Sequence, residues 1–214
     1  MKINLLNHQN HELLANYIVK QLDYLIIFNQ PKQQEKNKKI ILKHLKNTLN
    51  RLKILINSVR IWQENVFDIY HSSQYCIFLY LLAHTIFKES NQTELPTLLF
   101  LLNKKLNAID LFYEINLPEK FFIGHSVGIV FAKANYSNYF AIYQNCTIGR
   151  NHYGRPHIEE NVIVYPNSSI IGKAHIQKNT IISPGIQLIN QNTPPNTLVV
   201  QNSGGGGGIS FLKN

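Results

Sequence analysis

The second half of the chain carries one repeating pattern, an aliphatic residue at every sixth position. A helix repeats its apolar face about every 3.6 residues and a half-buried strand about every 2, so neither element explains this period. One short strand plus one corner does explain it, because a chain with an inward residue at each sixth position coils with three flat sides. The period therefore predicts a β-helix of hexapeptide repeats. The aliphatic positions are Ile158, Val164, Ile170, Ile176, Ile182 and Leu188, and small or branched residues follow four places after the first five: Val162, Ser168, Ala174, Thr180 and Ile186.

The same six-residue repeat continues upstream with two irregularities. It runs through Leu111, Leu117, Ile123 and Ile129, then slips by one residue to Tyr136, Ile142 and Ile148. One extra residue predicts a β-bulge at that point. The separation from Ile148 to Ile158 is ten, and the residues between them are turn formers. They predict a loop that projects from one corner.

The first part of the chain has a helical pattern instead. Apolar residues at steps of three and four predict an amphipathic helix after Pro31: Leu42, Leu45, Leu49, Leu52 and Ile56. Further helices are expected over 13–28, 72–87 and 97–106, the last started by Pro96. The predicted fold class is α+β, with an α-helical domain over 1–108 and a hexapeptide β-helix over 109–200.

A glycine-rich tail is expected over 201–214. The repeat ends in the sequence after Pro194 and Pro195, and five glycines stand at 204–208. Such a run has no side chains to pack, so we expect a flexible hinge there.

Composition is that of a globular protein. Hydrophobic residues make up 44% and charged residues 15% of the 214 residues. The longest apolar stretch, 75–87, is shorter than the roughly 20 residues that cross a bilayer, so no transmembrane segment is expected. The amino terminus lacks a signal-peptide pattern and only Cys76 and Cys146 occur. A cytoplasmic location is expected.

The formal net charge is +9. It is concentrated partly on the helix after Pro31 and its surroundings, at Lys32, Lys36, Lys38, Lys39, Lys43, Lys46, Arg51, Lys53 and Arg60. Phosphate backbones attract such cations, but no groove-reading motif accompanies them, and a solvated helix face is the simpler interpretation. No nucleic-acid partner is predicted, although steering of an anionic acceptor stays open.

Three stretches resemble the serine acetyltransferases, which belong to the hexapeptide acyltransferases with a left-handed parallel β-helix. Asp110 lies fifteen positions before His125, which stands in Gly124-His125-Ser126-Val127-Gly128-Ile129-Val130. The family has an aspartate fifteen positions before a histidine in a similar glycine-containing stretch. Gln144-Asn145-Cys146-Thr147-Ile148-Gly149 resembles the family's next motif, and Tyr70-His71-Ser72-Ser73-Gln74 resembles a stretch before its last helices.

The resemblance implies acetyl transfer from acetyl-coenzyme A to a hydroxyl group. His125 would be the general base, which suits an imidazole because its pKa lies near working pH. Asp110 would fix the tautomer of His125, and donors in the loop 149–157 would stabilise the oxyanion.

Departures from the family pattern point to a different acceptor. Gly124 replaces the aspartate that helps the family hold the amino group of serine, and Lys133 replaces a family glutamate. Aligned on Pro156, Arg155 falls where the family has its second histidine, and the loop is about four residues shorter. His152, Arg155, His157 and Lys133 are the candidates for acceptor binding. The short loop resembles those of the capsule and lipopolysaccharide branch of the family, which implies a saccharide hydroxyl as the acceptor. Serine is the alternative.

The resemblance also implies where the donor lies and how the chains assemble. Relatives place the pantetheine arm between neighbouring subunits along corners of small residues, which gives the candidates Gly149, Pro166, Gly172, Lys173 and Pro184. Gly172 alone is equally consistent with a tight turn. A homotrimer or a pair of trimers is expected.

Two other expectations concern chemistry outside this reaction. The nine histidines and two cysteines show no zinc-type spacing, so no metal is predicted, and His175 is expected in a surface corner. A non-catalytic β-helix scaffold or an anionic-polymer-binding protein stays open as a different class of function.

Overall fold

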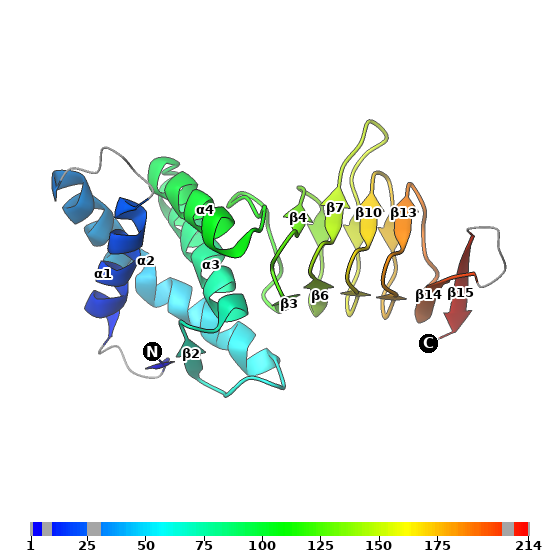
Figure 1. The fold of residues 1–214 in the computed structure, drawn as a ribbon, viewed down its shortest axis with the longest axis horizontal. Helices are drawn as coiled ribbons and strands as arrows, with labels where there is room; N and C mark the ends of the chain where they lie inside the picture. The colour runs from blue at the N-terminus through cyan, green and yellow to red at the C-terminus, as the bar shows by residue number, and fades with distance from the viewer. Residues whose placement is uncertain (1, 6–9, 25–30, 203–207, 214) are drawn as a thin grey trace. The chain divides into compact units, whose positions relative to one another are not determined.

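The computed structural model of the protein describes residues 2–5, 10–24, 31–202 and 208–213. The chain divides into two compact units: Met1–Asn107 with Phe112–Glu114, and Ala108–Leu111 with Ile115–Asn214. The first unit is helical and the second is a parallel β-helix (Figure 1). The predicted fold class is confirmed.

Within the described residues, the first unit contains four helices: α1 (His11–Asp23), α2 (Pro31–Ser58), α3 (Ser72–Ser90) and α4 (Glu94–Asn107). A small antiparallel pair, β1 (Lys2–Asn4) and β2 (Val66–Asp68), accompanies them. α2 begins at Pro31, whose fixed φ suits a first helical position. α3 is buried from Ser73 to Ile86 and ends at Asn91, which has the left-handed φ of 53°. α4 starts at Glu94, earlier than expected, because a proline is tolerated within the first helical turn. The predicted end of the first helix, at Phe28, lies outside the described residues.

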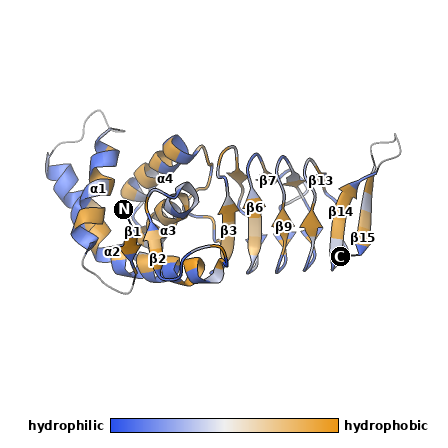
Figure 2. Ribbon diagram, turned by 60° about the horizontal axis from the view of Figure 1, so that its bottom comes forward, coloured by the Kyte–Doolittle hydropathy of each residue, from blue (hydrophilic) through white to orange (hydrophobic). Residues whose placement is uncertain are grey.

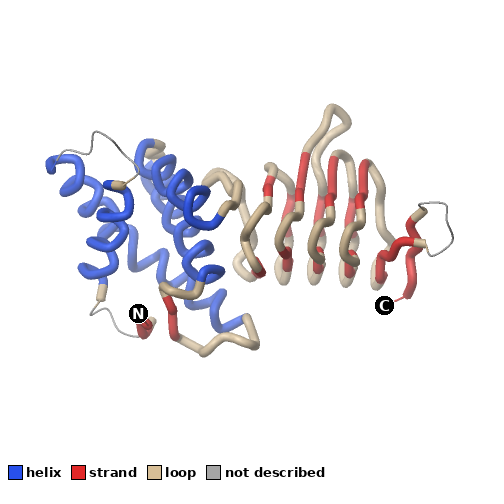
Figure 3. Tube along the Cα trace, viewed as in Figure 1, coloured by secondary structure: helices blue, strands red, loops and turns tan. Residues whose placement is uncertain are grey.

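In the described part of the chain, three sheets form the sides of the β-helix, and their strands pair in parallel except for β15 (Figure 3). Sheet 1 contains β4 (Val130–Phe131), β7 (Thr147–Gly149), β10 (Ser169–Ile171) and β13 (Gln187–Ile189). Sheet 2 contains β5 (Asn135–Tyr136), β8 (His157–Ile158) and β11 (His175–Ile176). Sheet 3 contains β3 (Phe121–Gly124), β6 (Phe140–Tyr143), β9 (Ile163–Val164), β12 (Ile181–Ile182), β14 (Thr197–Gln201) and β15 (Ile209–Lys213).

The hexapeptide positions fill the inside of the coil. All six aliphatic positions from Ile158 to Leu188 are fully buried, and so are the five small or branched positions between them. In Figure 2 the strands of this unit are largely orange and the corners largely blue. The sixfold beat therefore predicts the core correctly, because each buried side chain stacks on its counterpart in the next coil.

Asparagine shapes many of the corners. Six corner asparagines have left-handed φ values, which asparagine tolerates better than most residues. Their side chains bond from coil to coil, as in Asn161 to Asn179 at 2.8 Å and Asn179 to Asn196 at 2.7 Å. These ladders pair the side-chain amides of successive corners with one another. The six are Asn145, Asn161, Asn167, Asn179, Asn190 and Asn196.

The predicted one-residue bulge is wrong in its form. Gly124 pairs with Tyr143 and Val130 with Thr147, so five residues (125–129) fill a corner where the next coil has three (144–146). The following corner has three residues (132–134) between Phe131 and Asn135, one fewer than the four (171–174) between their equivalents Ile170 and His175 two coils later. The one-residue shift in the sixfold pattern is therefore the sum of two changes, two extra residues in the first corner and one residue fewer in the next.

The expected loop is present. Seven residues (150–156) lie between β7 and β8, where the next coil has three (172–174) between β10 and β11. This loop projects beyond the coil (Figure 1).

The carboxyl-terminal end differs from the expectation of a flexible tail. β14 still pairs in parallel with β12, so the coil continues by one strand after Pro195. β15 then runs antiparallel to β14, with Thr197 opposite Lys213 and Gln201 opposite Ile209. The predicted hinge at residues 204–208 lies outside the described residues except for Gly208.

Candidate active site

His125 lies in the enlarged corner of the first coil. β3 leads directly into it, and the corner returns to β4 after Ile129. His125 is exposed and has a φ of 53°, although the asparagines fill most such positions in this unit. A left-handed backbone costs a residue with a Cβ about 1–2 kcal/mol. Backbone strain of this kind collects at functional sites, so the enlarged corner marks His125 as a candidate.

Asp110 lies on the rung of sheet 1 directly before β4. Its backbone forms a parallel bridge with Val130, with its N–H donating to Ile129 O and its carbonyl accepting from Phe131 N, both at 2.9 Å. It therefore extends sheet 1 by one position beyond β4. The Gly128 N–H donates to Ala108 O at 2.9 Å, which ties the His125 corner to the strand that carries Asp110. The backbone segment of Asp110 is thus bonded to the corner that carries His125.

The loop 150–156 is folded on itself. Asn151 and Gly154 exchange backbone hydrogen bonds at 3.0 and 3.2 Å, and Asn151 Oδ1 accepts from the Tyr153 N–H at 2.9 Å. His152 is exposed, with its ring 3.8 Å from that of Tyr153. Arg155 is exposed as well. Both side chains are therefore accessible to an acceptor.

The predicted site residues divide between two edges of sheet 1. We call the corners that carry His125, Pro166 and Pro184 the His125 edge, since they join sheet 3 to sheet 1. The loop edge joins sheet 1 to sheet 2 and carries Lys133, residues 150–156, Gly172 and Lys173. Gly149 ends β7 at the loop edge. The cofactor candidates thus do not form one line of corners within a single chain.

Gly172 is required by its turn. Its φ is +77°, and a Cβ there would overlap the side chains of Asn151 and Asn190. Lys173 donates its backbone N–H to Asn190 Oδ1 at 2.9 Å. The tight-turn interpretation of Gly172 therefore has a structural reason of its own.

Aromatic side chains stand beside His125 on the outer face of sheet 3, and the sequence interpretation missed them. The rings of Tyr143 and Tyr165 stack at 5.4 Å with an interplanar angle of 11°. Phe122 meets Tyr143 edge-on at 5.8 Å. A Cβ on Gly124 would lie 2.6 Å from Tyr143 Cδ1, so the tyrosine ring covers the position just before His125. Burial raises the pKa of Tyr143, which keeps its hydroxyl protonated. The signal was available, because both tyrosines follow an inward repeat residue directly.

Two histidines lie elsewhere than expected. His157 follows the loop on β8 and faces outward from sheet 2, where Asn135 Nδ2 is 3.3 Å from its Nδ1. His175 is on β11 instead of in a corner, with Nε2 2.7 Å from Glu159 Oε1. Among the described residues, His157, Glu159 and His175 form the one group of three that could hold a metal ion. The fold has brought together ligands that the sequence separates.

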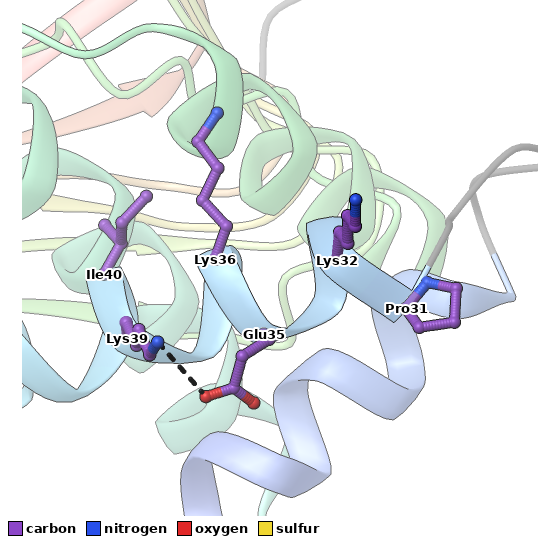
Figure 4. Close-up of a pocket in the computed structure, with 6 residues that line it drawn as sticks. All are labelled: Pro31, Lys32, Glu35, Lys36, Lys39 and Ile40. Carbon is purple, nitrogen blue, oxygen red and sulfur yellow. Dashed lines mark ion pairs between the residues drawn. The ribbon is translucent and has the colours of Figure 1, made fainter.

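Three lysines near the start of α2 pair with carboxylates. Lys36 pairs with Glu94 at 3.2 Å and Lys38 with Glu12 at 2.8 Å. A surface hollow lies over the start of this helix (Figure 4), where Lys39 pairs with Glu35 at 3.8 Å. Paired lysines agree with a solvated helix face.

The comparisons with known proteins identify the fold. A serine acetyltransferase from Neisseria gonorrhoeae superposes with a TM-score of 0.73 at 16% identity, over 97% of this chain and 80% of that one. The protein has the serine acetyltransferase fold. The soybean enzyme gives a TM-score of 0.71 at 15% identity, over 97% and 86% of the two chains. Isoform 3 of Entamoeba histolytica, solved with cysteine, gives 0.64 at 18%, over 89% and 70%.

The sequence comparisons found no match. No protein-family model and no curated protein sequence matches the chain. Within the described ranges, no helix has the length and apolar character needed to cross a membrane.

Proposed function

We propose that the protein is an acetyl-coenzyme A-dependent O-acetyltransferase. The observation that carries this proposal is the enlarged first-coil corner, which presents His125 outward next to the strand of Asp110 in a serine acetyltransferase fold. His125 takes the proton of an acceptor hydroxyl while the oxygen attacks the thioester carbonyl. The tetrahedral intermediate collapses, the C–S bond breaks, and the coenzyme A thiolate receives that proton from the imidazolium. The products are an ester and free coenzyme A.

Asp110 and the loop have supporting roles in this proposal. Asp110 orients His125 and stabilises its protonated form. The backbone N–H groups of Asn151, Tyr153 and Gly154 already donate within the loop. We therefore assign the oxyanion donor to a loop side chain, with Arg155 as first choice.

The division of residues between two edges supports a site shared by two protomers. One protomer supplies its His125 edge and the next supplies its loop edge, as in a closed homotrimer or a pair of trimers. The donor arm then lies along the corners between them, near Pro166, Pro184, Gly172 and Lys173. Val127 and Val130, exposed to 58% and 42%, belong to the surface that this contact would cover.

Complementation tests this arrangement. The first variant is His125→Ala, and the second lacks loop residues 151–154, which leaves a corner of ordinary length. Each variant alone should be inactive. Subunits mixed under reassembly conditions should regain up to about one quarter of the sites, because a site is intact only where the two undamaged edges meet. No recovery from well-reassembled mixtures would contradict a shared site.

The residues assigned to the proposed site favour a saccharide hydroxyl as the acceptor. Gly124 stands where the resemblance to the serine acetyltransferases implies a carboxylate that holds the amino group of serine. The Tyr143 ring covers the position of Gly124. Stacked tyrosines offer apolar faces to the C–H groups of a sugar ring and keep a hydroxyl donor at their edge. Lys133 and Arg155 would favour an acidic sugar.

L-Serine is the second candidate, and the comparisons favour it. The structural matches named above are serine acetyltransferases, and the structure of the soybean enzyme has also been solved with serine bound. In either case the reaction is an O-acetylation. The cytoplasm is the proposed location, since Cys76 and Cys146 are both free and buried.

The deciding experiment measures thiol release from acetyl-coenzyme A with L-serine and with a panel of capsular and lipopolysaccharide oligosaccharides. We expect turnover with a saccharide and little with serine. His125→Ala should lower the rate by about 10²–10⁴-fold without loss of the folded state. Efficient turnover of serine would show that serine, and not a saccharide, is the acceptor. No turnover with any acceptor would favour the non-catalytic scaffold alternative.

A further inference from the structure

Two histidines occupy neighbouring strands of sheet 2. β8 and β11 pair in parallel with His157 directly opposite His175. Since Ile158 and Ile176 are fully buried, the histidines before them point out of the coil. Glu159, two residues after His157, faces the same side by strand alternation. The surface of sheet 2 thus carries three potential ligands that share no motif in the sequence.

These side chains are close together. The ligand atoms of His157, Glu159 and His175 all lie within 4.8 Å of one another. The two imidazole rings are 4.9 Å apart at 80°, and His175 Nε2 lies 2.7 Å from Glu159 Oε1. His157 and His175 stand on strands, which hold their positions better than loop residues would, and Glu159 follows β8 directly.

The surroundings hold the ligands in place. Glu159 Oε2 accepts the Lys178 backbone N–H at 2.9 Å, which leaves Oε1 turned toward His175. Asn135 lies on the third strand, with its amide 3.3 Å from His157 Nδ1. An amide in this position can accept from Nδ1–H after rotation and so direct Nε2 outward. Outer hydrogen bonds of this kind orient metal ligands in many proteins.

Two imidazoles and one carboxylate are a donor set that Zn²⁺ prefers, with water in the fourth position. Ligand bonds of about 2.0–2.2 Å in a tetrahedral arrangement separate the ligand atoms by roughly 3.4 Å. The His175–Glu159 contact must therefore open by about 0.7 Å, and the other separations must close. Rotations of partly exposed side chains on a rigid sheet are sufficient for this.

We propose that His157, Glu159 and His175 bind one divalent transition-metal ion, with Zn²⁺ the preferred ion, and that the ion cross-links two successive coils. The site is separate from the His125 edge and does not depend on the acetyltransferase proposal. Its position has a structural effect, because His157 is the first residue after the loop 150–156. A bound ion fixes the carboxyl-terminal end of that loop.

The test uses the full chain without an affinity tag, stripped with a chelator. Titration calorimetry with Zn²⁺ should show one ion per chain, and bound Co²⁺ should give the visible absorption of a nitrogen- and oxygen-ligated ion. His175→Ala and Glu159→Gln should each weaken Zn²⁺ binding by at least about tenfold. His152→Ala, which removes an exposed histidine of the loop, is the matched control and should bind as the wild type does.

Thermal unfolding supplies a second readout. Zn²⁺ at saturating concentration should raise the melting temperature of the wild type and of His152→Ala, but not that of His175→Ala. The proposal is overturned if the wild type binds no ion, or if His175→Ala and Glu159→Gln bind Zn²⁺ with wild-type stoichiometry and affinity. In the first case the group is an ordinary histidine–carboxylate ion pair.

Discussion

Acid should destabilise the helical unit through one buried histidine. His84 lies on α3, is 6% exposed, and has Nδ1 2.8 Å from the backbone oxygen of Tyr113. Burial lowers its pKa to about 4, and the nearby cations Arg51 and Lys88 act in the same direction. His84 is therefore neutral near neutral pH and donates Nδ1–H to Tyr113 O.

The sign of the pH effect follows from the two pKa values. The unfolded chain takes up this proton near pH 6.5, whereas the folded chain takes it up only near pH 4. The stabilisation is complete above about pH 6.5 and is lost as the pH falls from there to about 4. At about 1.4 kcal/mol per pKa unit the total is about 3 kcal/mol, of which about 2 kcal/mol is lost between pH 7.5 and pH 5.

The chain offers a probe for this unit alone. Trp62 is the only tryptophan, it is buried, and it belongs to the helical unit. Urea unfolding followed by its fluorescence should show a midpoint about 1 M lower at pH 5 than at pH 7.5. The transition midpoint, and not the fluorescence intensity, is the quantity to compare, because the intensity of Trp62 also depends on its surroundings, such as the His71 ring 5.5 Å away.

His84→Gln is the matched variant, because it retains a donor for Tyr113 O but cannot titrate. Its midpoint should fall by much less over the same pH range, so that the wild-type loss exceeds the variant loss by about 2 kcal/mol. Equal losses in both proteins would show that other groups cause the acid effect and would refute the reasoning.

Three further predictions concern the β-helix. Gly172→Ala should cost at least about 2 kcal/mol of β-helix stability, because φ is positive and the added methyl group overlaps neighbouring side chains. Gly185 has nearly the same φ but open space around it, so Gly185→Ala should cost about 1 kcal/mol. Equal shifts in melting temperature for the two variants would contradict this. Asn179→Ala should destabilise the β-helix more than Asn179→Gly does. Both variants remove the ladder bonds, but only alanine is strained by the left-handed φ of 58°. Chemical denaturation would show the reverse order of stability if that strain is absent. Cys146 is buried, which raises the pKa of its thiol, so it should react with an aromatic disulfide reagent far more slowly in the folded protein than in urea; rapid reaction of the native protein would contradict the buried position.

The sequence predicted the coil well and its first corner poorly, for one physical reason. Inward residues such as Ile142 and Val164 repeat because each packs on the one below, so their spacing reports the coil directly. At the first corner both Ile129 and Phe131 are buried, and the shorter corner that follows removes one of the two extra residues. The spacing of hydrophobic residues shows only the total shift of one residue and not how it is divided between the two corners.

Residues on the outer faces were harder to predict, because their neighbours come from another coil. His157 and His175 are eighteen residues apart, which is one full coil of three hexapeptides, so the interval itself was the available signal. Tyr143 and Tyr165 come from successive coils in the same way. Asp110 and His125 were found by resemblance to a family, since no periodicity joins them.

The antiparallel strand β15 has a consequence for self-association. A parallel solenoid that ended at β14 would present open backbone groups to the first coil of another molecule, and end-to-end polymerisation could follow. β15 occupies this edge of sheet 3 and reverses the chain direction there. Its outer groups then have the alternating spacing of an antiparallel ladder, which does not match the even spacing of a parallel one. β15 thus blocks parallel end-to-end pairing at this edge of sheet 3.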